Sequence, residues 1–207
     1  HACALAADGS LYCWGDNSRG QLGIPDLLST DSARLVSEAL IVRSVSGGAF
    51  HTCAVTAEGR GMCWGLNFDG QLGIGTFATV LAPKAVKTEW LLKEITAGSV
   101  GTCAIAVSGD ALCWGSNWRG QLGDGTDFSR VMSAEDLRTA EPRKVLSQLP
   151  IAQISLGFGE HACGIDSGST PLCWGLNQSG QLGIGVIEAT SALAVPMRSV
   201  PTRVVDP

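Results

Sequence analysis

The sequence predicts an all-β fold made of four copies of one repeated unit. Four segments align without gaps, and they begin at His1, His51, Gly101 and His161. Within each copy, short apolar stretches alternate with turn-forming Gly, Asn and Asp residues. No stretch shows a long apolar pattern at helical period, apart from one or two turns near residues 134–137. Together these observations indicate a repeated array of β-sheets.

Each copy begins with two short strand-like stretches. In the first copy these are residues 3–5 and 11–14, separated by the turn Ala7-Asp8-Gly9. The sequence Trp-Gly-x-Asn-x-x-Gly-Gln-Leu-Gly then follows at the same register in every copy, although the copies start 50, 50 and 60 residues apart. Its Trp residues are Trp14, Trp64, Trp114 and Trp174.

A looser segment completes each unit. It contains Pro-x-x-Val in three copies, with Ala33 and Val36 in the first, and it is followed by a short apolar strand. Four short antiparallel strands in a unit of this length are typical of a propeller blade, which buries its faces only by stacking on neighbours. The Pro-x-x-Val pairs are Pro83/Val86, Pro142/Val145 and Pro201/Val204, and the apolar strands are 41–47, 91–98 and 151–157.

The run Cys-Trp-Gly-x-Asn-x-x-Gly-Gln-Leu-Gly, preceded by His-x-Cys-Ala and followed by Pro-x-x-Val, resembles the regulator of chromosome condensation repeat. The resemblance covers the whole chain, and it implies a β-propeller that usually has seven blades. This chain supplies four units, and no apolar strand precedes His1. We therefore expect residues 1–207 to form a single repeat array that is part of a longer chain and a larger ring. A closed four-bladed ring is the alternative.

The eight cysteines fall into four pairs of identical spacing. A turn with Gly separates the members of the first three pairs, and in such a hairpin Cys3 faces Cys13 directly. Opposed Cα atoms at a non-hydrogen-bonded pair lie about 4.5 Å apart, which a disulfide can span. We predict disulfides within blades and hence an oxidising, extracellular, periplasmic or cell-surface location. The pairs are Cys3/Cys13, Cys53/Cys63, Cys103/Cys113 and Cys163/Cys173.

Two other roles for these cysteines stay open. They could be reduced and packed in the core, or they could bind zinc together with the His that precedes three of the pairs. Zinc is disfavoured because Gly101 replaces that His in the third copy. In the fourth copy Gly168 comes one place early and Pro171 precedes Cys173, so a different turn is expected there.

The charge of the chain argues against nucleic acid as a partner. Its 14 Lys and Arg are scattered and outnumbered by 19 acidic residues, and the pI is about 5.1. Hydrophobic residues make up 45%, which is enough for a folded core, while the apolar runs are too short to span a membrane. The chain begins without Met or an apolar leader, so a signal peptide is either absent or already removed.

The repeated polar and aromatic residues are interpreted as structural. Asn-x-x-Gly is a turn signature, and the following Gln is expected to satisfy backbone groups in that turn. The Trp residues are expected to pack between blades, in preference to a light-sensing cluster like that of the related plant ultraviolet-B photoreceptor. Three equivalent His-x-Cys sequences argue for packing, since a nucleophilic pair needs one special copy. No catalytic residue, metal ligand or cofactor is predicted.

Variable positions in a repeat array are candidates for partner contacts. The long connections after Gly-Gln-Leu-Gly vary, at about 24–36, 74–83, 124–142 and 184–200. The residue after the turn Asn varies too, and in two consecutive copies it is the large aromatic Phe68 or Trp118. Exposed aromatics beside charged residues resemble a protein-binding hot spot. The alternative is that both side chains lie back on the neighbouring blade.

The function predicted from these features is a non-enzymatic, extracytoplasmic scaffold that binds another protein or a surface ligand. The resemblance includes a secreted propeller that inhibits β-lactamases, but no residue here can be matched to its contacts. The second hypothesis is a guanine-nucleotide exchange factor or chromatin-associated regulator, the best-known role in the family. The acidic pI and the paired cysteines argue against that hypothesis.

Overall fold

The computed structural model describes residues 1–126, 133, 137–158, 160–186 and 196–205 of the chain. In these ranges the chain forms β-strands and no α-helix, so the predicted all-β fold is confirmed. The helical turns that the sequence predicts near 134–137 fall mainly on residues 134–136, which lie outside the described ranges.

The described strands form four antiparallel sheets, one of three strands and three of four. Each sheet corresponds to one predicted blade. The first contains β1 (Ala2–Leu5), β2 (Leu11–Asp16) and β3 (Ser29–Leu35), and the second β4 (Val42–Gly47), β5 (His51–Thr56), β6 (Gly61–Gly65) and β7 (Val80–Ala85). The third contains β8 (Leu92–Ala97), β9 (Gly101–Ala106), β10 (Ala111–Ser116) and β11 (Arg138–Lys144), and the fourth β12 (Ile151–Leu156), β13 (His161–Asp166), β14 (Pro171–Leu176) and β15 (Met197–Arg203).

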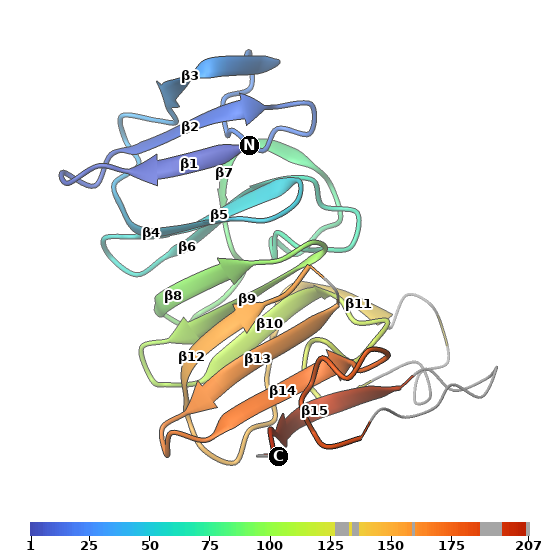
Figure 1. Cartoon of the computed structure of the whole chain (residues 1–207). Coiled ribbons are helices and arrows are strands. Elements are labelled where there is room, and N and C mark those ends of the chain that lie inside the picture. Colours follow the sequence, from blue (N-terminus) through green and yellow to red (C-terminus); the bar gives the residue numbers. More distant parts are fainter. Residues whose placement is uncertain (127–132, 134–136, 159, 187–195, 206–207) are drawn as a thin grey trace.

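The sheets stack in chain order to give an open arc. The first and fourth blades, and with them the two chain ends, lie at opposite ends of the stack (Figure 1). Within the described residues β15 pairs only with β14, and no sheet joins the first blade to the fourth. The chain by itself is therefore not the closed four-bladed ring that was the alternative to an arc.

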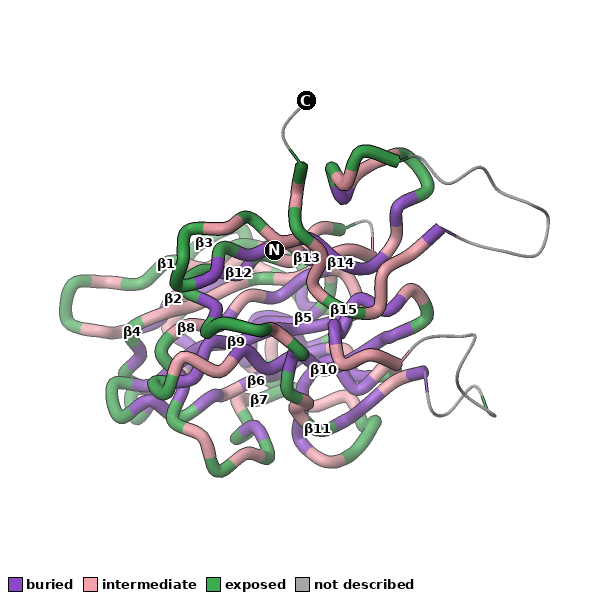
Figure 2. The backbone as a smooth tube through the Cα atoms, turned by 90° about the horizontal axis from the view of Figure 1, so that it is seen from below, coloured by how far each residue is buried: buried purple, intermediate pink, exposed green. Residues whose placement is uncertain are grey.

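The core lies between the blades, in three clusters that each join two consecutive sheets. The apolar strands β4, β8 and β12 contact one another from blade to blade, while the Pro-x-x-Val segments form the outer strands. Strands β5, β9 and β10 are buried along their whole length (Figure 2). Both faces of a middle blade are thus covered, as the stacking of propeller units requires.

One backbone carbonyl joins each pair of consecutive blades. The Gln71 carbonyl of the second blade accepts hydrogen bonds from Trp114 Nε1 at 2.9 Å and from Thr102 Oγ1 at 2.7 Å, both in the third blade. Both donors are fully buried, so leaving either unpaired would cost about 1–3 kcal/mol. The indole also lies against Gly73, where a Cβ atom would be 2.6 Å from Nε1 and where φ is +67°. Only glycine fits at this point of the motif.

The other two seams between blades repeat this arrangement with one change. At the first seam the Gln21 carbonyl accepts from Trp64 Nε1 at 3.1 Å and from Thr52 Oγ1 at 2.7 Å. At the third seam Trp174 Nε1 donates to the Gln121 carbonyl at 2.9 Å, but Ala162 stands where the Thr would be. The predicted packing of Trp between blades is confirmed at all three seams.

The repeated His belongs to the same network. His51 Nε2 lies 2.9 Å from Thr102 Oγ1, and His1 Nε2 lies at the same distance from Thr52 Oγ1. Because the Thr102 hydroxyl gives its proton to the Gln71 carbonyl, His51 must donate from Nε2, and its Nδ1 then carries no proton. This Nδ1 is buried and has no hydrogen-bond partner among the described residues. Burial lowers the pKa of His51 to about 4.

The third seam lacks both members of this pair. Gly101 replaces the His and Ala162 replaces the Thr. Leu156 Cδ2 lies 3.5 Å from the place of a Cβ atom on Gly101, whereas the equivalent residue at the first seam is Gly47, which lies against the His1 ring. At the third seam the Leu156 side chain thus occupies the place that the His imidazole and the Thr hydroxyl occupy at the other two seams.

The four predicted disulfides are present, and each joins directly opposed residues whose Cα atoms are 4.1 Å apart. All eight cysteines are bonded, so the reduced and zinc-binding alternatives are wrong for this structure. The predicted turn is present in the first hairpin, where Gly9 has a φ of +87°. In the fourth hairpin Ser169 takes this position with a φ of +65°, so that turn differs as predicted, while Cys163 still faces Cys173.

The buried His51 predicts a loss of stability in mild acid. Because its folded pKa is below the unfolded value of about 6.5, folding favours neutral His51, and this contribution is complete above that pH. It should fall by about 3 kcal/mol as the pH drops from about 6.5 to 4. Unfolding in urea across this range should therefore be less pH-dependent in His51→Gln than in the parent chain. Identical pH profiles for the two proteins would contradict the assignment.

Candidate partner-binding surface

The predicted candidate residues lie at one end of the blades, which is called the turn face here. It is formed by the four Asn-x-x-Gly-Gln turns, at residues 17–23, 67–73, 117–123 and 177–183. The disulfide hairpins turn at the other end, called the hairpin face, because β5 runs from the turn face and β6 runs back to it. Strands β2, β6, β10 and β14 end at the turn face, and the long variable connections start there.

Hydrogen bonds hold each turn of this face in a fixed shape. In the second blade, Asn67 Oδ1 accepts from the Leu72 N–H at 2.9 Å, and Gln71 Oε1 accepts from the Asp69 N–H at 3.0 Å. Asn67 Nδ2 donates to the Thr76 carbonyl at 2.7 Å, which ties down the following connection. The third blade has the same Asn and Gln bonds. The structural interpretation of the repeated Asn and Gln is therefore confirmed.

Phe68 and Trp118 occupy equivalent points of these turns on consecutive blades. Phe68 is 60% exposed and Trp118 is 37% exposed. Both are thus accessible from the turn face, although Trp118 is covered for more than half of its area. Because the turns that carry them are hydrogen-bonded, little conformational entropy would be lost when a partner packs on them.

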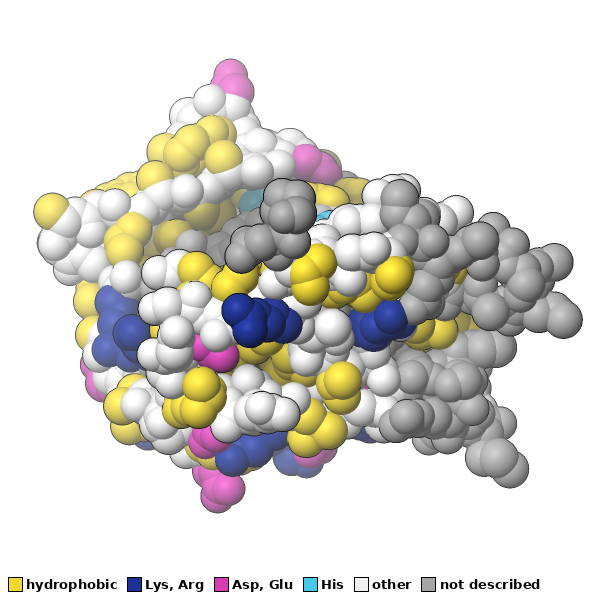
Figure 3. All heavy atoms as spheres, turned by 60° about the horizontal axis from the view of Figure 1, so that its bottom comes forward, with side chains coloured by type: hydrophobic (Ala, Val, Ile, Leu, Met, Phe, Trp, Pro, Cys, Tyr) yellow, Lys and Arg dark blue, Asp and Glu magenta, His cyan; other side chains and the backbone are white. Residues whose placement is uncertain are grey.

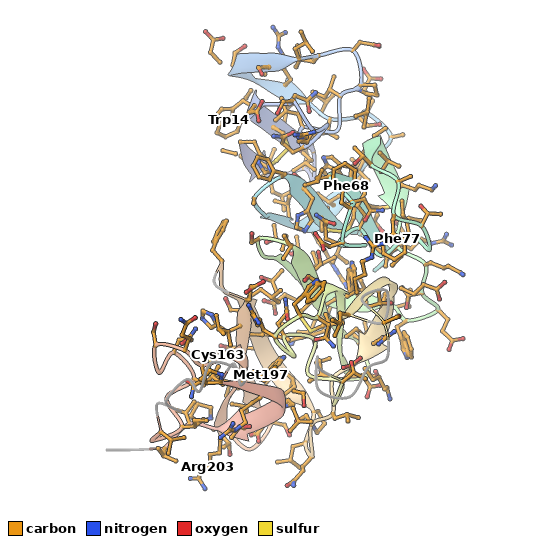
Figure 4. All side chains as sticks on the ribbon, turned by 90° about the vertical axis from the view of Figure 1, so that its right-hand side faces the viewer. Trp14, Phe68, Phe77, Cys163, Met197 and Arg203 are labelled. Carbon is orange, nitrogen blue, oxygen red and sulfur yellow. A yellow bond between two sulfur atoms is a disulfide. The ribbon has the colours of Figure 1, made fainter. Side chains whose placement is uncertain are left out.

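A third aromatic residue, Phe77, lies close to Phe68 and is 40% exposed. Arg138 of the third blade connects the two, since its Nη1 donates to the Phe68 carbonyl at 2.6 Å and its guanidinium lies 4.4 Å from the Phe77 ring centroid. Figure 4 shows Phe68 and Phe77 at the same end of the second blade. Arg138 therefore ties the aromatic residues of one blade to the outer strand of the next.

Charged groups border these aromatics. Arg119 Nε lies 3.5 Å from Glu160 Oε2, which joins the third blade to the loop before β13. Burial raises the pKa of Asp69, and the nearby Glu160 carboxylate raises it further, while Arg138 opposes the shift. Asp69 is thus a half-buried carboxylate whose charge Arg138 stabilises against burial and the Glu160 carboxylate.

Three residues of this surface were missed from the sequence. Phe77 and Arg138 lie in connections that the sequence marks as variable, but they were not singled out because no repeat position corresponds to an aromatic or a basic residue there. Glu160 follows a one-residue insertion relative to the other copies, and this insertion was the available signal. None of the three has a motif of its own.

No group of three or more His, Cys, Asp or Glu side chains in the part of the chain that the structure describes is arranged to hold a metal ion. The described residues also include no helix that is long and apolar enough to cross a membrane.

Stacked antiparallel blades with repeated seams define the chain as a β-propeller repeat protein. Family models of the regulator of chromosome condensation (RCC1) repeat match residues 1–21, 42–71 and 108–164, about half of the sequence. The chain belongs to the regulator of chromosome condensation repeat family.

Solved structures share this fold over 99% of the chain. Human WBSCR16 matches with a TM-score of 0.81 and 23% identity, over 50% of its own length. The crystal structure of Kap60 bound to yeast RCC1 (Prp20) matches at 0.80 and 22%, over 46% of that chain, and Prp20p of Saccharomyces cerevisiae at 0.79 and 21%, over 48%. The chain therefore spans about half the length of these proteins. No curated protein sequence matches it significantly.

Because Phe68 and Trp118 are exposed, replacing either should destabilise the fold much less than replacing a buried Trp. Phe68→Ala and Trp118→Ala should each lower the free energy of unfolding by less than about 1 kcal/mol, because neither side chain fills a core cluster. The control is Trp114→Ala, which removes a fully buried indole from the second seam and should cost at least about 3 kcal/mol. Urea unfolding compares the variants. A loss for Trp118→Ala as large as that for Trp114→Ala would show that Trp118 is core.

Proposed function

We propose that the chain is a non-enzymatic, extracytoplasmic scaffold that binds another protein through its turn face. The observation that carries this proposal is the exposure of Phe68 and Trp118 on hydrogen-bonded turns of two consecutive blades, with Phe77 also exposed in the connection after the first of these turns. Large aromatic side chains on a preorganised backbone are the usual anchors of protein interfaces. Protein binding also agrees with the fold, which the chain shares with yeast RCC1 (Prp20), a protein solved in complex with Kap60.

The four disulfides support the extracytoplasmic part of the proposal. Disulfides persist in oxidising compartments and are rare in the cytosol. Each bond here closes a short hairpin within one blade. In the second and third blades both Cys residues lie in a seam cluster, with Cys63 and Cys113 fully buried. A reduced chain would lose a covalent link in every blade.

The structural use of the repeated polar residues supports a non-enzymatic role. Asn67, Gln71, His51 and Thr102 are all buried, and each makes a hydrogen bond within a turn or across a seam. Residues that are buried and bonded in this way serve the packing of the blades. The turn face contributes contact area and shape instead.

A role as an exchange factor or chromatin-associated regulator is the second proposal. It is supported by the fold shared with yeast RCC1 (Prp20), for which the solved structures describe a complex with Kap60 and binding to Gsp1p and histones. Identity of 21–22% is too low to transfer such partners to this chain. The disulfides favour the extracytoplasmic scaffold.

We also propose that residues 1–207 form one repeat array within a larger ring. Both outer blades carry a face like those that meet at the seams. Trp14 stands where the other Trp residues donate across a seam, and a groove lined by Ile165, Pro171 and Leu172 opens on the fourth blade. Figure 3 views this end and shows hydrophobic side chains scattered between single basic ones. Further blades of the same repeat would cover both faces.

Site-directed photocrosslinking tests the turn face as the binding surface. With p-benzoylphenylalanine in place of Phe68, we expect a specific covalent adduct in the extracytoplasmic fraction of cells that produce the protein. The control places the same group at Val107, which is 65% exposed on the hairpin face. Trp118→Ala should weaken binding of the adduct partner by at least about 2 kcal/mol, or roughly thirtyfold. Equal adducts from both positions, or unchanged affinity in Trp118→Ala, would contradict the proposal.

A further inference from the structure

A groove of about 490 Å³ lies at the third seam, on the hairpin face. One wall is Leu146–Leu149, part of the connection between the third and fourth blades, which bends at Gln148 and Leu149. The other wall is Val200–Arg203 of the outer strand β15. Leu172 forms part of the floor. Leu146 is 58% exposed and Leu149 is 46% exposed, so much of the wall is aliphatic and open to solvent.

The second seam has an ion pair where this groove is apolar. There Lys87 Nζ lies 2.6 Å from Glu141 Oε1. The repeat register makes Leu146 and Val200 the equivalents of these two residues. The surroundings of two equivalent glycines confirm this. A Cβ atom on Gly75 would contact Lys87 and Glu141. A Cβ atom on Gly125 would contact Leu146 and Val200. The ion pair has thus been replaced by two aliphatic side chains.

A second ion pair is also missing from the third seam. In the third blade Lys144 Nζ lies 3.0 Å from Asp110 Oδ1 of the hairpin turn. The equivalents in the fourth blade are Arg203, which is opposite Leu172 in the sheet, and Thr170. Arg203 accordingly has no acidic partner among the described residues. It lies at the edge of the fourth blade (Figure 4).

The acidic group that lines the groove does not balance this cation. Asp166 is 7% exposed, and its Oδ1 accepts hydrogen bonds from the N–H groups of Gly168 at 2.8 Å and Thr170 at 2.9 Å. Its charge therefore stabilises the fourth hairpin turn. The groove presents aliphatic walls, one guanidinium and the exposed amide of Gln148.

We propose that this groove binds an extended peptide segment of a partner protein that carries aliphatic side chains next to a carboxylate. The carboxylate pairs with Arg203, whose planar guanidinium suits bidentate binding. The aliphatic side chains pack between Leu146, Leu149 and Val200, and the Gln148 amide hydrogen-bonds to the peptide backbone. An extended chain fits because one wall, Val200–Arg203, belongs to the extended outer strand β15. The groove is at the opposite end of the blades from Phe68, so the proposal is independent of the turn face.

Fluorescence polarisation with a labelled synthetic peptide, acetyl-Gly-Leu-Glu-Leu-Gly-amide, tests the proposal on the intact chain. We expect saturable binding that weakens at least about tenfold when the peptide Glu is replaced by Gln, and by a similar factor in Arg203→Gln. The double variant Leu146→Lys with Val200→Glu copies the ion pair of the second seam and should abolish binding. Lys144→Gln, which alters the equivalent cation at the second seam, should leave binding unchanged.

Three outcomes would overturn the inference. The first is the absence of saturable binding by the parent chain, and the second is equal affinity for the Glu and Gln peptides. The third is binding of 4-methylpentanoate as tight as that of the peptide, which would show a small-molecule carboxylate site. Thermal unfolding of each variant checks that it remains folded. Because the double variant reproduces a pair that the fold already contains, we expect its melting temperature to stay close to that of the parent.

Discussion

The backbone carbonyl of the Gln in each Gly-Gln-Leu-Gly turn is the group on which the stacking of the blades depends. It points across the seam and, at the first two seams, accepts from both a buried indole and a buried Thr hydroxyl of the next blade. A propeller blade cannot cover its own faces, so the fold exists only if neighbours meet in one register. A shared acceptor fixes that register, because both donors would be left unpaired in any other. The turn must then be rigid, which explains the Asn and Gln side-chain bonds within it.

This constraint allows the residues around the carbonyl to differ from seam to seam. Where they differ, residues that contact one another are replaced together. At the third seam Gly101, Ala162 and Leu156 together replace a His, a Thr and a small residue. On the outside of the same seam, Leu146 and Val200 replace Lys87 and Glu141. Loss of one partner alone would leave a polar group without a hydrogen bond or counter-charge, which lowers stability, whereas loss of both partners changes stability little. Seams can therefore acquire different outer surfaces without losing the stacking, and the hairpin-face groove is one such surface.

The sequence predicts the scaffold well because the scaffold repeats. Disulfide partners, turn residues and the Trp contacts follow from register, since four copies must satisfy the same local geometry. The candidate surface is harder to predict from the sequence. Phe68 and Trp118 stand out only because no turn requires an aromatic residue there, and Arg138 reaches Phe68 across a seam from 70 positions away. The groove was not predicted at all, because its character depends on absent ion pairs, which become visible only when equivalent positions are superimposed in space.

The most direct test of this account compares two Trp→Phe substitutions. Trp114 donates its indole N–H to the Gln71 carbonyl, whereas the Trp14 indole forms no hydrogen bond within the described residues. Trp114→Phe should lower the free energy of unfolding by at least about 2 kcal/mol, since it leaves a buried acceptor short of a donor and a gap beside Gly73. Trp14→Phe should change it by less than about 0.5 kcal/mol. Equal effects of the two substitutions in urea unfolding would show that the carbonyl does not hold the blades together.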